Sequence, residues 1–342
     1  QPEPSQTAIQ AKLDLPEQAF DYEGLDYPDH FLSRFNFVTR VNPEVSNDGA
    51  TLGRVLFYDT KMSINNSVAC ASCHHQSKGF ADGMVGSQGF GGKITPRNSL
   101  SIANGSISNN LFWDSRVNSL KDLILEPVQN HIEMGMEDID LLTSKLAATD
   151  YYPELFEKAY GDKNVTADRI SDAVAQFLGS MKSVNAKYDK ALSSNDFSEY
   201  SSLENLGKEI FFSSKGQCSA CHAGANFSSI NSYYDNNSLR GATNIGLDAE
   251  YVDKGIERGR FRIPSLRNVE LTAPYMHDGR YQSIEDVIEH YRNPPNTEHG
   301  LAQIQPISEE EAAQLAGFLR ALSSPIQPDA WYNNPPEFLS EP

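Results

Sequence analysis

The chain has 342 residues, 39% of them hydrophobic, and its 46 acidic and 28 basic residues give a formal net charge of −18. A surface this acidic repels nucleic acid and anionic lipid, which excludes both as partners, and no apolar run is long enough to span a membrane. The acidity suits a basic protein partner or serves solubility. The length is sufficient for about two domains.

The N-terminal region, residues 1–45, begins QPEPSQTAIQ, which is polar and contains proline. Such a start resembles the trimmed beginning of an exported protein, so we expect a periplasmic or otherwise exported location. This region contains no cysteine, and we expect it to form an extension that wraps the outside of the molecule.

Two copies of one motif use all four cysteines of the chain: Cys70-Ala-Ser-Cys73-His74 and Cys218-Ser-Ala-Cys221-His222. A zinc site would accept this cysteine spacing but needs no histidine after each pair, and a thioredoxin-type pair belongs in a βαβ context that the sequence lacks. C-x-x-C-H is the attachment motif of c-type haem, where two thioethers and a proximal imidazole account for every residue. The motifs therefore predict two covalently bound haem c groups, with His74 and His222 as proximal ligands.

The surroundings of the two motifs repeat. LGRVLFYD (52–59) precedes the first and LGKEIFFS (206–213) the second, while WDSRVNSLKDLI (113–124) and HDGRYQSIEDVI (277–288) follow them. Such self-similarity indicates a duplicated unit. We predict a mainly α fold of two cytochrome c-like haem domains related by internal duplication. Their ranges are 46–195 and 196–342, and the second ends in a proline-rich tail.

Helical patterns support this fold class. Thr166 can cap a helix whose apolar stripe runs from Ile170 to Met181, and Ser308 with Glu311 forms a capping box before another apolar stripe. Further helices are expected at 119–126, 137–148, 201–212 and 283–292. Loops rich in glycine, asparagine and serine are expected at 83–110 and 223–248.

Five further stretches complete the pattern: TPRNS (95–99), LFWDSRVNSL (111–120), IEMGM (132–136), IPSLRN (263–268) and LTAPYMHDGR (271–280). With them, the chain from about residue 46 to 323 resembles the bacterial di-haem cytochrome c peroxidase and MauG family. The resemblance implies that hydrogen peroxide is reduced at the N-terminal haem and that the C-terminal haem stores electrons. A small cytochrome or cupredoxin would supply those electrons to a peroxidase, whereas a MauG-like enzyme would oxidise side chains of a partner protein. A non-enzymatic di-haem electron carrier is a third reading.

The resemblance also bears on the far side of the first haem. Members of the family often carry a distal histidine in the loop after the first motif, but no histidine lies between His75 and His131. We therefore expect an open sixth position that binds peroxide without prior reduction of the second haem. Met84 could fill it, although a methionine in a glycine-flanked loop is more often packed or exposed. We interpret His75 as a surface or supporting residue.

Two residues take roles in the peroxide reaction through the resemblance. Glu133 matches the family's distal glutamate, which takes a proton from peroxide and returns it to the leaving oxygen. Trp113 matches the tryptophan that relays electrons between the haems. Leu123 stands where the family has a glutamine, and this difference removes one hydrogen-bond donor from the pocket.

The resemblance implies an unusual sixth ligand for the second haem. Tyr291 occupies the position of the peroxidases' methionine, as a tyrosine does in MauG, and Met276 is a rival ligand. An anionic tyrosinate lowers the reduction potential of the iron. Arg258, Arg260 and Arg262 lie in the general region where haem propionates need cations.

The family also binds calcium between its domains. The matching ligands are the Asn98 side chain and the backbone carbonyls of Thr272 and Pro274. Oxygen donors suit this hard cation.

Overall fold

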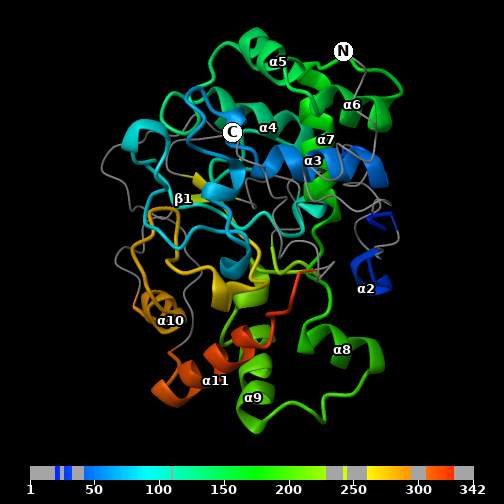
Figure 1. The fold of residues 1–342 in the computed structure, drawn as a ribbon. Coiled ribbons are helices and arrows are strands. Elements are labelled where there is room, and N and C mark those ends of the chain that lie inside the picture. Colours follow the sequence, from blue (N-terminus) through cyan, green and yellow to red (C-terminus); the bar gives the residue numbers. More distant parts are fainter. Residues whose placement is uncertain are drawn as a thin grey trace.

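The computed structural model describes residues 20–23, 27–32, 42–108, 111–228, 242–244, 260–293 and 306–326. Within those ranges the fold is mainly helical, as predicted, with one two-stranded antiparallel sheet (Figure 1). The α-helices are α2 (Asp29–Leu32), α3 (Asn47–Tyr58), α4 (Leu120–Gln129), α5 (Ile139–Ala147), α6 (Tyr152–Tyr160), α7 (Ala167–Ser180), α8 (Lys187–Ser194), α9 (Ser202–Phe212), α10 (Ile284–Arg292) and α11 (Glu309–Arg320). None of these helices is both long and apolar enough to cross a membrane.

Short elements carry the cysteine motifs and the turns. The 3-10 helices are η2 (Thr60–Met62), η3 (Cys70–Ser72), η4 (Gln76–Lys78), η5 (Phe90–Gly92), η6 (Gly105–Ile107), η7 (Cys218–Ala220) and η8 (Val269–Leu271). The strands are β1 (Ala242–Asn244) and β2 (Arg260–Arg262), paired with Thr243 opposite Phe261.

The predicted helices all form, with ends that shift by a few residues. Thr166 caps α7 by accepting the Arg169 amide, and the Ser308–Glu311 capping box begins α11. Helix α4 continues past its predicted end through Pro127, because a proline in the last turn removes only one helical hydrogen bond. Helices α2, α3, α6 and α8 are additional to the predicted set.

In the N-terminal half, α3 crosses α7, and α4 and α6 pack beside this pair. Gly53 lies at the crossing: a methyl group there would stand 1.9 Å from the carbonyl oxygen of Ala173, so the two backbones can approach this closely only at a glycine. Phe57 of α3 and Phe177 of α7 meet edge to face at 5.3 Å between ring centroids, and both are fully buried.

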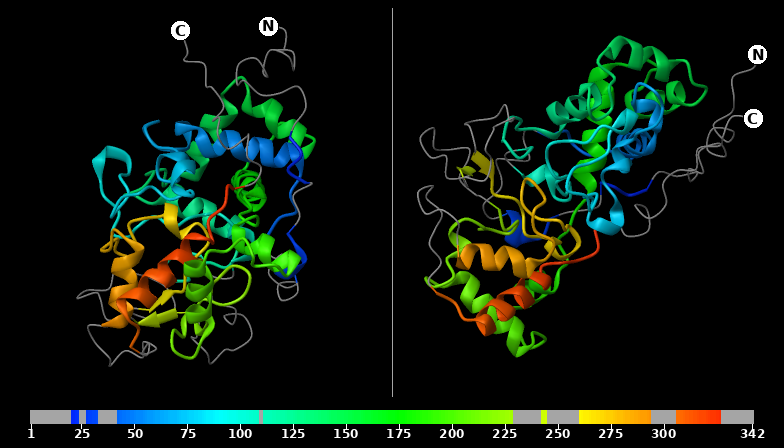
Figure 2. Two further views of the ribbon diagram at one scale, coloured as in Figure 1. Left: turned by 90° about the horizontal axis from the view of Figure 1, so that it is seen from below. Right: turned by 90° about the vertical axis from the view of Figure 1, so that its left-hand side faces the viewer.

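The C-terminal half repeats this arrangement with α9 and α11. Gly207 is the counterpart of Gly53 in the repeated sequence, and a methyl group there would stand 1.9 Å from the carbonyl oxygen of Gln314. Phe211 and Phe318 pack at 5.2 Å in a core distinct from that of the first half. Figure 2 shows the two helix groups as separate bodies. This paired crossing is what the internal repeat predicts, while the residue at which one domain ends stays a prediction.

A buried polar cluster joins the halves at Ser183, in the segment between α7 and α8. Asn104 of the first half donates to the Ser183 carbonyl at 2.9 Å and accepts from its amide at 2.8 Å. Asn268 of the second half donates to the Ser183 hydroxyl at 2.9 Å and accepts from the Ser324 amide at 2.8 Å. Both asparagines have a φ of 56°, in the left-handed region that asparagine tolerates well. We call these four residues the Ser183 clasp.

The described pieces of the N-terminal extension insert side chains into both halves. Tyr22 is buried in the first core. Phe31 is buried beneath the guanidinium of Arg267, 4.4 Å from it, and His30 Nε2 lies 3.0 Å from Asp189 Oδ1 on α8. The extension therefore does more than wrap the outside, because its aromatic rings bury apolar area in the molecule.

Candidate functional sites

The first cysteine motif lies on η3, shortly after α3. The amides of Cys73 and His74 both donate to the Cys70 carbonyl at 3.1 Å, which winds the motif into a tight turn. His74 Nδ1 lies 2.8 Å from the carbonyl oxygen of Phe80. Because a carbonyl only accepts, Nδ1 carries the ring proton, and Nε2 keeps its lone pair for a metal.

The second motif has the same geometry. The amides of Cys221 and His222 donate to the Cys218 carbonyl at 3.2 Å and 2.8 Å. His222 Nδ1 lies 3.1 Å from the carbonyl oxygen of Phe227, so this ring also carries its proton on Nδ1. Each half thus presents two neighbouring thiols and an imidazole in the tautomer that ligates through Nε2.

Two buried phenylalanines hold the carbonyls that orient these imidazoles. Phe80 and Phe227 have φ values of 59° and 48°, in a region that bulky residues rarely adopt. Edge-to-face packing on Phe57 at 6.2 Å and on Phe211 at 5.7 Å fixes the two rings and stabilises the strained backbone. The sequence predictions give these residues no role; their signal is the phenylalanine that ends the loop after each motif, in KGF and ANF.

Burial sets the protonation of both motifs. It raises the pKa of the Cys70 thiol to about 12, that of Cys73 to about 11 and that of Cys218 to about 12. It lowers the pKa of His74 and of His222, against the effect of the backbone carbonyls beside them. Thiols and imidazoles are therefore neutral at pH 7, and the four cysteines form no disulfide.

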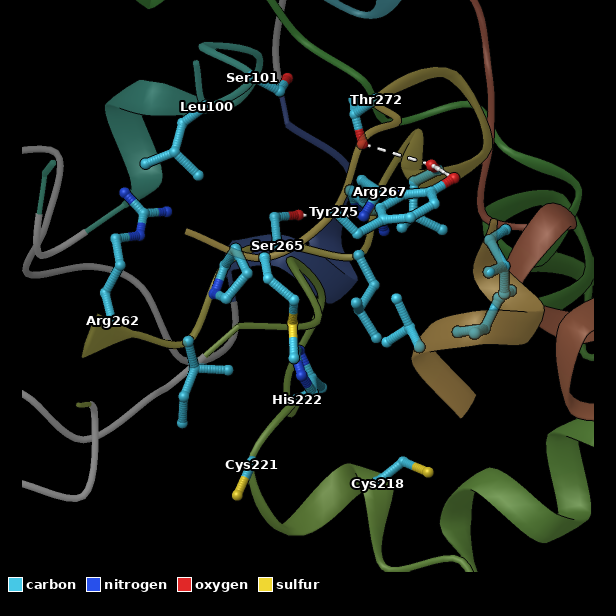
Figure 3. Close-up of a pocket in the computed structure, with 18 of the residues that line it drawn as sticks. Leu100, Ser101, Cys218, Cys221, His222, Arg262, Ser265, Arg267, Thr272 and Tyr275 are labelled. Atoms are coloured by element: carbon cyan, nitrogen blue, oxygen red, sulfur yellow. Dashed lines mark hydrogen bonds between the residues drawn. The ribbon is translucent and has the colours of Figure 1, made fainter. Parts of the chain in front are cut away.

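A mainly apolar cavity of about 270 Å³ opens beside the second motif. Figure 3 shows Cys218, Cys221 and His222 along one part of its wall, with Leu100 and Arg262 along another. Residues of both halves line it, so the cavity lies between them. Its lining from the first half includes Asn98, Ser99, Leu100, Ser101, Ala103, Ser108 and Trp113.

The donors and the cavity fit haem c. A covalently attached porphyrin needs two thiols outside any disulfide, an imidazole with its Nε2 lone pair available, and an apolar cavity. The second motif has all three, and the first has the same donors in the same geometry. Within the described ranges, no group of three or more His, Cys, Asp or Glu side chains could hold a metal ion.

Trp113 reaches the cavity from the first half. Its indole N–H donates to the Asn98 carbonyl at 2.8 Å, and its own carbonyl accepts from the Arg262 amide at 2.8 Å. The Trp113 ring meets the buried His277 ring at 6.3 Å, and His277 stacks on Phe261 at 3.7 Å with 14° between the planes. His277 and Phe261, to which the sequence predictions give no role, thus extend the tryptophan into a run of three adjoining rings.

Glu133 lies in a turn near the first motif. Its carboxylate accepts a hydrogen bond from the Asn130 amide at 2.9 Å. Burial raises the pKa of Glu133, and the charge of Arg116 lowers it in part. The Glu133 charge in turn raises the pKa of both thiols of the first motif. A half-buried carboxyl of raised pKa holds a proton more readily than an exposed one, so it can serve as an acid as well as a base.

Other residues predicted near the first haem lie in varied surroundings. His75 is exposed, and its backbone pairs with Ala81. The side chain of Met84 is 56% exposed. Leu123 on α4 is half-buried against the first core. His75 and Met84 therefore face solvent, and Leu123 supplies apolar packing.

Both candidate sixth ligands of the second haem line the cavity together with His222. Tyr291 lies in the last turn of α10, and burial with the nearby Cys221 and Cys218 raises its pKa to about 12. Met276 lies in the turn before α10 with a φ of 72°.

The predicted calcium ligands also meet at this cavity. Asn98, Thr272 and Pro274 all line it. Asn98 Nδ2 donates to the Met84 carbonyl at 2.7 Å, so the side-chain oxygen of Asn98 is not used in that contact.

Of the three arginines predicted near haem propionates, Arg262 lines the cavity, and burial lowers its pKa to about 10. Arg258 and the side chain of Arg260 lie outside the described residues.

Comparison with known proteins finds cytochrome peroxidases and MauG proteins among the similar chains. The family model described as di-haem cytochrome c peroxidase matches residues 47–196. The cytochrome c551 peroxidase of Nitrosomonas europaea is 30% identical over 302 residues, which cover 85% of this chain and 84% of that protein. The methylamine utilization protein MauG of Methylorubrum extorquens is 31% identical over 292 residues, which cover 83% of this chain and 80% of that protein.

Comparison with solved structures finds chains of similar fold. A MauG-like protein associated with microbial copper homeostasis matches with a TM-score of 0.76 and 28% identity, over 90% of this chain and 99% of that chain. The di-haem peroxidase BthA from Burkholderia thailandensis matches with a TM-score of 0.68 over 87% of this chain and 89% of that chain. Its identity of 19% makes that likeness one of fold alone.

Proposed function

The chain belongs to the di-haem cytochrome c peroxidase family, and on that premise we propose that it reduces hydrogen peroxide beside the first cysteine motif. Each motif would hold one haem c through its two thiols, with His74 and His222 as proximal ligands. When bound, the haem supplies the redox-active iron at which the peroxide bond is cleaved. The proposal keeps the expectation of an exported location.

Glu133 moves the protons in this reaction. It takes a proton from the inner oxygen of peroxide and returns it to the outer oxygen, which leaves as water. Two electrons and two protons from solvent complete the conversion of peroxide to two waters. The observation that carries the proposal is this half-buried carboxyl of raised pKa close to the thiols of the first motif. A non-enzymatic electron carrier has no use for such a group.

Trp113 passes electrons between the halves. Its ring lines the cavity of the second motif, while its N–H is held by Asn98, a residue of the first half. Aromatic rings between two redox centres divide one long electron transfer into shorter ones. A calcium ion at Asn98, Thr272 and Pro274 would bind both halves at this point and hold the tryptophan's surroundings together.

The source of electrons separates two versions of the proposal. In the first, a small cytochrome or cupredoxin supplies them. In the second, the enzyme is MauG-like and takes them from side chains of a partner protein. Tyr291 at the cavity beside the second motif favours the MauG-like version, because an anionic oxygen ligand lowers the potential of the iron and makes it a poor acceptor from ordinary cytochromes.

Substitution of Glu133 tests the proposal. In protein shown by mass to carry two haems, Glu133→Gln should slow peroxide consumption with a small dye donor by about a hundredfold or more, the usual effect of a positioned acid–base group. Glu137→Gln, at an exposed glutamate four residues further on, is the matched control and should leave the rate unchanged. Equal rates in the two variants would remove Glu133 from the reaction.

A further inference from the structure

An exposed apolar patch lies on the loop of residues 83–97. Met84, Val85 and Ile94 are 56%, 55% and 60% exposed, the highest values for large hydrophobic side chains among the described residues. Ile94 packs beside Gly86, since a methyl group at that glycine would stand 2.9 Å from Ile94 Cγ2, and Val85 precedes Gly86 directly. Single exposed apolar residues are common, but a contiguous group on a folded loop is typical of an interaction surface.

Two exposed lysines border this patch, in a chain whose net charge is −18. A methyl group at Gly83 would stand 3.7 Å from Lys78 Nζ, and Lys93 directly precedes Ile94; residues 78–97 contain one acidic residue. The acidic residue, Asp82, is buried, where it accepts bonds from the Ser87 hydroxyl at 2.5 Å and the Met84 amide at 2.8 Å. Lys78 and Lys93 are exposed. The patch is therefore apolar with a basic rim, and it complements an acidic partner.

The loop is fixed in place. The amide of Ser87 donates to Thr95 Oγ1 at 2.8 Å, and the amide of Thr95 donates to the Ser87 carbonyl at 2.9 Å. Val85 packs on Gly279, where a methyl group would stand 2.8 Å from Val85 Cα. A surface held this firmly loses little freedom when a partner binds.

Short contacts connect the loop to both candidate redox sites. On one side, Ser87 lies beside the Cys73 thiol of the first motif. On the other side, Asn98 Nδ2 donates to the Met84 carbonyl at 2.7 Å, and Trp113 donates to the Asn98 carbonyl at 2.8 Å. Two hydrogen bonds, from Asn98 to Met84 and from Trp113 to Asn98, would therefore connect the tryptophan to the loop on which the partner binds.

We propose that Met84, Val85 and Ile94, with the rim lysines Lys78 and Lys93, form the docking surface for an acidic redox protein that exchanges electrons with this enzyme. The inference rests on the proposed function and specifies the charge of the partner and the surface on which it binds. It reverses what the charge of the whole chain suggests, since a net charge of −18 alone would favour a basic partner.

The test uses the protein with both haems bound and two reduced protein donors. Plant plastocyanin, an acidic copper protein, should bind and be oxidised in a peroxide-dependent reaction that weakens with added salt. Lys78→Glu should lower its kcat/KM roughly tenfold, mainly through KM, because a rim charge acts on the association rate. Ile94→Ser should lower it without changing the salt dependence. Lys158→Glu, at an exposed lysine of α6, is the matched control and should have no effect.

Three results would overturn the docking surface: a preference for mitochondrial cytochrome c, a basic donor; no binding or oxidation of plastocyanin; or equal effects of Lys78→Glu and Lys158→Glu. A small dye donor separates this outcome from failure of the proposed function. All variants should consume peroxide with the dye at the unaltered rate. If the unaltered protein consumes no peroxide with the dye, the peroxidase proposal fails. The docking surface would still be supported if plastocyanin binds in a salt-sensitive way and Lys78→Glu weakens that binding.

Discussion

Glu133 is the residue whose titration should be visible in turnover. Burial raises its pKa, and Arg116 opposes that rise. As a base Glu133 must be ionised, so the rate should fall as the pH drops through a pKa above the ordinary glutamate value of about 4.3. Arg116→Gln should raise the pKa further and move this acid limb to higher pH, whereas Arg116→Lys should restore it.

The measurement is the pH profile of kcat/KM for peroxide with a dye donor. Arg169→Gln, at an arginine paired with Asp162 in the same half, is the control and should leave the acid limb in place. A limb that moves to lower pH in Arg116→Gln would show that another group titrates.

Tyr291 can be separated from Met276 by spectroscopy. If Tyr291 ligates the second haem, the unaltered protein should lack the thioether-to-iron charge-transfer band, and Tyr291→Met should gain it. The same variant should have a higher reduction potential, because a neutral sulfur replaces an anionic oxygen. Met276→Leu should change neither property. Loss of a thioether band in Met276→Leu would instead identify Met276 as the ligand.

At single residues, local patterns could be predicted and distant contacts could not. The positions of His74 and His222 follow from five-residue motifs. The stack of His277 on Phe261 depends on how the turn after η8 packs against β2, and the φ of 59° at Phe80 depends on a ring packed in the core. Neither feature produces a residue spacing in the sequence from which it could be predicted.

Among the elements, the two glycine crossings should determine stability. Alanine has a higher helix propensity than glycine by about 1 kcal/mol, yet Gly53→Ala and Gly207→Ala would each force a methyl group against a carbonyl of the opposing helix. The overpacking should lower the free energy of unfolding by roughly 1–3 kcal/mol, measured in guanidinium. Gly179→Ala on α7 is the control, because the nearest atom there is a methyl carbon of the Val45 side chain, 3.3 Å away, and not a backbone carbonyl. A larger loss in the control would contradict this account.

The same elements show what patterning can and cannot predict. Helices α7 and α11 have both an apolar stripe and a capping residue, so their starts could be placed from the sequence. The two-stranded sheet pairs Ala242 with Arg262, and the Ser183 clasp joins Asn104 to Ser183. Such pairings form only when the chain folds and brings together residues that are far apart in the sequence. No local periodicity of the sequence therefore predicts them.

Across the whole molecule, Arg267 connects segments from four parts of the chain. It donates to both carboxylate oxygens of Asp189 at 2.7 Å, to the Ser183 carbonyl at 3.2 Å and to the Ala225 carbonyl at 2.7 Å. Its guanidinium also covers the ring of Phe31. Extension, linker, α8 and the loop of the second motif are thus joined at one buried cation. Its stretch, IPSLRN, is one of those that carry the family resemblance, and here it has a structural use.

The Asp189–Arg267 pair should therefore hold the molecule together in a pH-dependent way. Burial alone would raise the pKa of Asp189, but the hydrogen bonds and charge of Arg267, with a bond from His30, lower it below its usual value. A carboxyl of lowered pKa stabilises the fold above its unfolded pKa and loses that effect as the pH falls through the folded value. Asp189→Asn would leave Arg267 buried without its counter-charge, at a cost of roughly 3–5 kcal/mol in the free energy of unfolding at pH 7.

Guanidinium unfolding of the unaltered and Asp189→Asn proteins at several pH values measures this cost. The difference between them should be largest near neutral pH and should shrink below the ordinary aspartate pKa of about 3.9, as Asp189 becomes protonated in the unaltered protein. Asp196→Asn is the control, since Asp196 is exposed and its side chain bonds only its own turn at Ser198, and it should change the free energy of unfolding far less than Asp189→Asn does. Replacing both partners, with Asp189→Leu and Arg267→Met, should recover most of the loss, because no unpaired charge then remains buried. A loss at Asp189 that is the same at pH 7 and pH 3 would show that packing, and not the charge pair, joins these segments.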